Sequence, residues 1–308
     1  LGALLKDLGK LQEAEKSTRK AIKINPKCAM AHLNLGTILN DLDNLQEAEI
    51  SYRKTIELNP NFADAHLNLG NIFRDRWKLQ DAELSYRKAI ELKPDYAKAY
   101  SNLGNILKDL GKLQEAEVST RKAIQLNPDF AEAHSNLGLI LKDLGKLEEA
   151  EVSTRKAIQL NPDFTDVYLN LGIILKDLDQ LQEAEVSTRK AIELKPDFTD
   201  AHLNLGIILK DLGQLQEAEV STRKAIEIKP DFAEAHYNLG IILRELKKLD
   251  SAISSLDKAS KLGMEYKLCL SGIGDMLLDK GKHAEGISKL KAGQGRIEFN
   301  LKQGLSFN

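Results

Sequence analysis

The residues of this sequence best suited to bind a ligand are seven asparagines that recur at a constant spacing of 34 residues. A carboxamide offers one acceptor and two donor hydrogens, so it can pair with both the N–H and the C=O of one peptide unit without reading a side chain. Asparagine is a mediocre helix former, so its repetition at one place in a helical pattern needs a reason. The candidate peptide-binding residues are Asn34, Asn68, Asn102, Asn136, Asn170, Asn204 and Asn238.

Two interpretations of this asparagine column remain open. If the helices that carry it pack ~8–10 Å apart, one carboxamide meets about every third residue of an extended ligand that rises ~3.3 Å per residue. Each hydrogen bond contributes ~0.5–1.5 kcal/mol, so several together would hold a main chain. In the alternative, each asparagine bonds a neighbouring helix and sets the stacking. The sequence favours ligand binding.

The whole chain follows the asparagine period. All seven prolines are also spaced 34 residues apart, and a fixed period of this size is the signature of a stacked-repeat architecture. We predict a truncated first unit over residues 1–28, seven complete units over 29–266, a degenerate last unit or cap over 267–295 and a strand-like tail over 296–308.

Each unit contains two helical patterns. In the unit 131–164, apolar residues recur at three- and four-residue steps up to Leu144, which is typical of an amphipathic helix, and Gly145 then ends it. A second apolar pattern begins at Leu147 and ends at Pro162, because the residue before a proline is pushed out of the helical region. Neither helix can bury its apolar stripe alone. The sequence therefore predicts an all-α solenoid of antiparallel helix pairs.

The two ends of the chain depart from the period. Leu1 and Gly2 have the phase of Leu-Gly pairs found in the middle of later units, which predicts that the first unit lacks its start and that the chain is a fragment of a longer protein. Residues 296–301 and 305–307 alternate like short strands around a turn at Gln303 and Gly304. Two strands alone are barely stable, so we predict a capping tail or the entry to an absent domain.

Composition argues against several classes of partner. Forty-four basic and 46 acidic residues give a net charge of −2, so no overall field favours nucleic acid or an anionic membrane. No apolar run approaches the length of a membrane span. The two cysteines, Cys28 and Cys269, show no disulfide pattern and suit a reducing compartment. We expect a cytoplasmic protein whose partner is another protein or peptide.

A second column of charged residues lies six positions beyond the asparagines. Each member is followed by an acidic residue, so the column is either a groove edge that prefers an acidic ligand or, as we favour, a solvated margin whose charges largely cancel. The possible groove-edge residues are Arg74, Lys108, Lys142, Lys176, Lys210 and Arg244.

No pattern in the sequence predicts catalysis, a metal or a cofactor. The histidines recur one repeat apart, too far to share an ion that must lie ~2 Å from each nitrogen, so we interpret them as packing residues. The segment Gly272-Ile-Gly274 lacks the strand and the third glycine of a dinucleotide loop. We expect no catalytic residue, no metal and no cofactor in this chain.

The repeat resembles the tetratricopeptide repeat. Leu137-Gly138, Ala150, Ala157 and Pro162 have the spacing of that family, and the resemblance extends over residues 1–293. It implies a right-handed superhelix in which the first helix of each pair lines a concave groove and the second helix lies outside.

A closer resemblance concerns the asparagine itself. Ala133-His134-Ser135-Asn136-Leu137-Gly138, preceded by Pro128-Asp129-Phe130, resembles the repeat arm of the O-linked N-acetylglucosamine transferases, in which a matching asparagine ladder grips the backbone of substrate proteins. Clamps of this family that seize a terminal carboxylate use basic residues on the first helices. Here those positions are mostly acidic, as at Glu132 and Asp166, so the carboxylate clamp is not supported.

Two functions from different classes follow. The first is a non-catalytic scaffold that binds an extended peptide segment in the groove. The alternative is the substrate-recognition arm of a larger enzyme, a glycosyltransferase above a sulfotransferase or an oxygenase. Self-association through uncapped ends is a further expectation.

One recurring groove position changes from polar to apolar along the chain: Thr37, Asn71, Asn105, Leu139, Ile173, Ile207 and Ile241.

Overall fold

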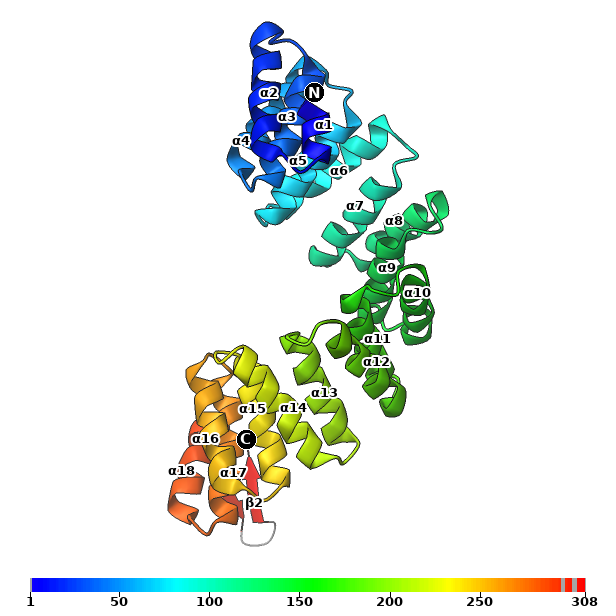
Figure 1. Cartoon of the computed structure of the whole chain (residues 1–308). Coiled ribbons are helices and arrows are strands. Elements are labelled where there is room, and N and C mark those ends of the chain that lie inside the picture. Colours follow the sequence, from blue (N-terminus) through cyan, green and yellow to red (C-terminus); the bar gives the residue numbers. More distant parts are fainter. Residues whose placement is uncertain (1, 295–296, 301–303, 308) are drawn as a thin grey trace. The chain divides into compact units, whose positions relative to one another are not determined.

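The computed structural model describes residues 2–294, 297–300 and 304–307, and these residues form an α-solenoid of helix pairs (Figure 1). The chain divides into two compact units, residues 1–161 and 162–308, which we describe separately. The helices of the first unit are α1 (Gly2–Asp7), α2 (Leu11–Ile24), α3 (Ala29–Asp41), α4 (Leu45–Leu58), α5 (Ala63–Asp75), α6 (Leu79–Leu92), α7 (Ala97–Asp109), α8 (Leu113–Leu126), α9 (Ala131–Asp143) and α10 (Leu147–Leu160).

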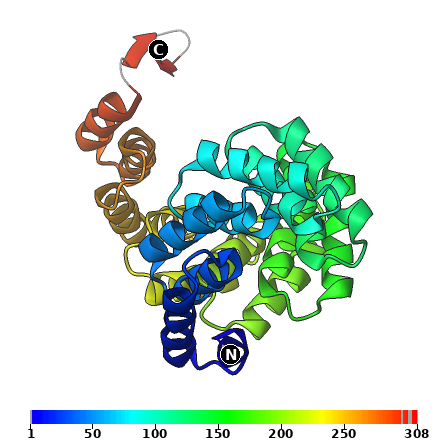
Figure 2. The same ribbon diagram turned by 90° about the horizontal axis from the view of Figure 1, so that it is seen from above.

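The second unit continues the same alternation and ends in two strands that follow the last helix (Figure 2). Its elements are α11 (Thr165–Asp177), α12 (Leu181–Leu194), α13 (Thr199–Asp211), α14 (Leu215–Ile228), α15 (Ala233–Glu245), α16 (Leu249–Lys261), α17 (Tyr266–Asp279), α18 (His283–Gln294), β1 (Ile297–Asn300) and β2 (Gly304–Phe307).

The helix ends are set by the residues that the sequence places there. After α7, Gly111 adopts a left-handed φ of 73°, and the Lys112 amide donates a 2.8 Å bond to the carbonyl of Leu107. This contact satisfies a carbonyl that would otherwise be orphaned at the helix end. After α8, Asn127 is extended with φ −140°, the conformation required before Pro128.

Close approach of the two helices in a pair depends on glycine. A methyl group built on Gly138 in α9 would lie 2.2 Å from the hydroxyl oxygen of Thr154 in α10. In α5, the same addition to Gly70 would lie 2.6 Å from the ring of Tyr86. Each pair therefore packs around a glycine that no larger residue can replace without displacement.

The core runs along the stack and is not gathered at one centre. In the first unit it joins Leu39, Ile72, Ile106 and Ile140 from successive first helices, all fully or almost fully buried. Helices contact mainly their neighbours in the chain. The stability of such an array is approximately the sum of the stabilities of single repeats and of the interfaces between neighbouring repeats.

The segment after α18 forms two short antiparallel strands, with Ile297 paired to Phe307 and Asn300 to Gly304. Gln303, part of the predicted turn, lies outside the described residues, and a domain beyond these strands stays a prediction. Across the described part of the chain, no helix combines the length and the apolar character that crossing a membrane would require.

Candidate functional site

All seven candidate asparagines lie five residues after the start of a first helix, from α3 to α15. Six of them are half-buried, and only Asn204, at 7% exposure, is buried. Partial exposure leaves most of these carboxamides within reach of a ligand.

Three asparagines donate a hydrogen bond to the preceding repeat. Asn102 Nδ2 donates to Asn71 Oδ1 at 2.9 Å, and Asn136 Nδ2 donates to the Ser101 hydroxyl at 3.1 Å. In the second unit, Asn204 Nδ2 donates to the Thr188 hydroxyl at 3.1 Å. These three contribute to the stacking of repeats, as the packing interpretation requires.

The remaining asparagines behave differently. Asn238 Nδ2 donates to the Glu234 carbonyl of its own helix at 2.8 Å. Asn34, Asn68 and Asn170 make no side-chain hydrogen bond to any described residue. Because a half-buried carboxamide without a protein partner is satisfied only by solvent or a ligand, these three are the members of the column most available to a peptide.

A cluster of polar side chains surrounds the column on α5 and α7. Asn71 Oδ1 accepts bonds from the Tyr86 hydroxyl at 2.8 Å and from Asn102 at 2.9 Å. Burial raises the pKa of Tyr86, so its hydroxyl stays protonated and donates. Asn68 and Asn105 are half-buried beside them on the same two helices. This segment presents several carboxamides where α9 presents Leu139.

The basic column is largely neutralised within each helix. Five of its members contact the acidic residue that follows, at the distances given by Arg74–Asp75 (2.8 Å), Lys108–Asp109 (3.6 Å), Lys142–Asp143 (3.0 Å), Lys176–Asp177 (3.1 Å) and Lys210–Asp211 (2.7 Å). Arg244 makes no such contact with Glu245 among the described residues. This pairing fits a margin whose charges largely cancel, and the role of these residues as a groove edge stays a prediction.

The histidines hold the turns between repeats. In His32, His66, His134, His202 and His236, ring Nε2 lies 2.9–3.0 Å from the carbonyl of the proline six residues earlier. A carbonyl only accepts, so Nε2 carries the proton. Among the described residues, no group of three or more histidine, cysteine or acidic side chains is placed to hold a metal ion.

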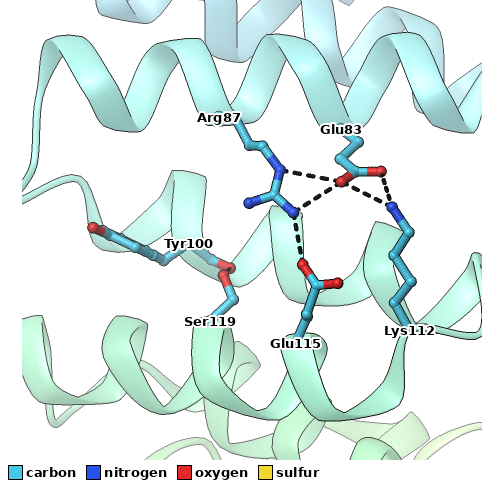
Figure 3. Close-up of polar contacts among 6 residues, drawn as sticks. All are labelled: Glu83, Arg87, Tyr100, Lys112, Glu115 and Ser119. Atoms are coloured by element: carbon cyan, nitrogen blue, oxygen red, sulfur yellow. Dashed lines mark hydrogen bonds and ion pairs between the residues drawn. The ribbon is translucent and has the colours of Figure 1, made fainter.

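One feature of the second helices was not visible in the sequence. Arg87 on α6 contacts Glu83 of its own helix at 2.9 Å and Glu115 of α8 at 2.8 Å. Lys112, the residue before α8, also contacts Glu83, at 2.9 Å (Figure 3). The same pattern recurs one repeat later at Arg121, Glu117, Glu149 and Lys146. The contacts of Arg87 and Arg121 within their own helices are thus parts of an ionic ladder between repeats.

The repeats match models of a known protein family. Models described as tetratricopeptide repeat match residues 1–61, 97–130, 131–164, 154–186, 188–220 and 233–262. A model described as TPR repeat matches residues 70–111 and 208–246. Together these matches cover well over half of the chain. No curated protein matches.

Solved structures support the same fold. YrrB, a protein with tetratricopeptide repeats described as having an unusual peptide-binding site, is similar at 25% identity and a TM-score of 0.50 over 61% of this chain and 96% of its own. The pilF protein of Pseudomonas aeruginosa matches at 23% identity and a TM-score of 0.60, covering 67% of this chain and 94% of its own. A repeat protein of Parabacteroides merdae matches at 20% identity and a TM-score of 0.63, covering 81% of this chain and 98% of its own.

Proposed function

Because the chain belongs to the tetratricopeptide repeat family, we propose that it is a non-catalytic scaffold that binds an extended segment of another protein along its first helices. The observation that carries this proposal is the set of half-buried carboxamides without a protein partner, Asn34, Asn68 and Asn170. Each can accept from one ligand amide and donate to one ligand carbonyl.

The asparagines that bond the preceding repeat can still form some hydrogen bonds to a peptide main chain. Asn102 and Asn136 each use one donor hydrogen in the bonds described above, which leaves the carbonyl oxygen and a second hydrogen. Main-chain pairing of this kind gives affinity without reading side chains. Selectivity then belongs to the variable position, which is Asn71 and Asn105 on α5 and α7 and Leu139 on α9.

The similarity to YrrB supports a peptide as the ligand, since that protein is described by its peptide-binding site. The predicted enzyme-arm function remains a second candidate, because an asparagine ladder would grip a substrate protein in the same way. Reading the gene on both sides of this sequence separates the two candidates: an adjoining catalytic domain would support the enzyme arm.

The asparagines divide into two sets that make the proposal testable. We expect Asn34→Ala, Asn68→Ala and Asn170→Ala combined to weaken capture of an unstructured peptide about tenfold or more, because several bonds of ~0.5–1.5 kcal/mol are lost. The measurement is fluorescence anisotropy of labelled random-sequence peptides. Urea unfolding should be unchanged, since these side chains bond no described residue.

The matched control is the pair Asn136→Ala and Asn204→Ala. These residues hold neighbouring helices, so we expect a lower urea midpoint. Unchanged peptide binding in the first variant would overturn the proposal and leave the column a packing device.

A further inference from the structure

Two apolar grooves, which we call the outer grooves, lie between α6, α8 and α10, three second helices of the first unit. The first lies between α6 and α8, has Leu103 and Leu107 of α7 as its floor and Val118 as one wall, and holds about 500 Å³. The second lies between α8 and α10, with Leu137 and Leu141 of α9 below and Val152 as a wall, and holds about 690 Å³.

The walls carry aliphatic side chains that the fold does not bury. Val118 is 71% exposed and Val152 is 70% exposed, although the leucines below them are almost fully buried. Leu84 on α6 occupies the same place at 66% exposure. Exposed apolar side chains repeated beside a groove mark an interaction surface.

Charge distinguishes these two grooves from those of the repeats in which the equivalent lysine forms an ion pair three residues on. In the first, Glu115 is held by Arg87, and the charge that remains is Lys122, whose Nζ donates to the neutral Gln125 at 3.0 Å. In the second, Glu149 is held by Arg121, and Lys156 donates to the neutral Gln159 at 3.1 Å.

One acidic residue lines the second groove without neutralising its lysine. Glu148 is eight residues before Lys156 on α10, about 12 Å along the helix axis. In four other repeats glutamate replaces the glutamine and forms an ion pair with the lysine: Lys54–Glu57, Lys88–Glu91, Lys190–Glu193 and Lys224–Glu227.

We propose that the outer grooves bind an extended, acidic segment of a partner protein, with aliphatic side chains in the two grooves and carboxylates on Lys122 and Lys156. The ligand class follows from the apolar floors together with the two cations that lack an acidic partner on their own helix. Second helices packed ~10 Å apart are spanned by about three extended residues, so aliphatic residues at every third position would enter successive grooves. This surface is separate from the asparagine column.

The probe is a labelled peptide of about twelve residues that repeats Glu-Leu-Ser, titrated with the full chain at about 100 mM NaCl and followed by fluorescence anisotropy. We expect saturable binding that weakens about tenfold in the double variant Gln125→Glu and Gln159→Glu. These changes install the ion pair that other repeats already contain, so the fold is preserved. Binding should also be lost in Val118→Asp combined with Val152→Asp.

Matched controls locate the effect. Gln182→Glu with Gln216→Glu adds the same charge on α12 and α14 and should leave the affinity unchanged. The loss caused by Gln125→Glu with Gln159→Glu should persist in a chain that also carries Asn34→Ala and Asn68→Ala, which separates the outer grooves from the asparagine column. Peptides that repeat Lys-Leu-Ser or Glu-Ser-Ser should bind the wild-type chain no more tightly than the double glutamate variant, because each lacks either the carboxylates or the aliphatic side chains. Equal binding of the basic peptide, no effect of the glutamate variants, or no binding at all would overturn the proposal. Dimerisation of the wild-type chain through Val118 would also overturn the proposal. Binding of anionic vesicles in place of the peptide would do the same.

Discussion

At the scale of single residues, the asparagines of the column differ in the groups that they bond. Asn136 follows Ser101, which accepts its hydrogen bond, whereas Asn68 follows Leu33, which offers no polar side chain. The column is uniform in sequence and mixed in structure. We expect its ligand-binding members to be those without a side-chain bond to a described residue, which are Asn34, Asn68 and Asn170.

The sequence predicted residue types and register but not these pairings. Asn136 and Ser101 are 35 residues apart, and Asn102 and Asn71 are 31 apart. Neither separation is a helical period, so the contact depends on how far one repeat is displaced against the next. That displacement results from packing of whole helices, which a residue pattern does not encode.

Trp77 gives a prediction at the same scale. It adopts a φ of 55° at the turn after α5 and is 79% exposed, where Gly111 and Gly145 occupy equivalent turns. A side chain in the left-handed region costs ~1–2 kcal/mol, and an exposed ring regains little of it. We expect Trp77→Gly to raise the free energy of unfolding by about 1 kcal/mol in urea titrations. The reciprocal Gly111→Trp should lower it; a stabilising effect there would contradict the argument.

At the scale of elements, the ionic ladder joins second helices to the next repeat within each unit, as at Arg87–Glu115 and Arg189–Glu217. The Glu–Arg pairs within a helix are four residues apart, a spacing that can be read from a sequence. No helical spacing indicates the contact of Lys146, which lies 2.8 Å from Glu117 although 29 residues separate the two. Gln180 and Gln214 occupy the equivalent place in two other repeats, so this rung of the ladder is interrupted there.

This ladder has a pH dependence that can be measured. The hydrogen bond from Lys146 lowers the pKa of the Glu117 carboxyl below its ordinary value of 4.5. A lowered folded-state pKa means that the stabilisation is present above that ordinary value and is lost as pH falls through the folded-state pKa. We expect Lys146→Gln to cost about 0.2–1 kcal/mol at pH 7 and to cost nothing once the carboxyl is protonated.

The measurement is the urea midpoint of both proteins from pH 7 to about pH 3. Gln214→Lys is the matched variant that should gain the contact. It places an amine 29 residues after Glu185 in the second unit, at the position equivalent to Lys146. A Lys146→Gln deficit that persisted at low pH would show that lost packing, not charge, is responsible.

At the scale of the whole molecule, repeats are exchangeable because helices contact mainly their neighbours in the chain. Removing residues 97–130 would bring α9 and α10 against α5 and α6. Arg87 would then meet Glu149 in place of Glu115, and Lys146 would meet Glu83 in place of Lys112. The ladder contacts would be re-formed by equivalent residues.

We therefore expect this deletion to fold. Its helicity per residue should be unchanged by circular dichroism, and its urea m-value should fall by about a tenth, because m scales with the surface exposed on unfolding. Loss of cooperative unfolding would instead indicate that residues 97–130 hold contacts that their neighbours cannot replace.

The contact between each histidine and the proline six residues earlier has a practical consequence. Five imidazoles are held in one tautomer by the same bond, and each lies in a different repeat. When a repeat opens, its ring is released to exchange tautomers with water. Nitrogen-15 spectra of the ring nitrogens would thus report, from inside the native protein, the order in which individual repeats come apart.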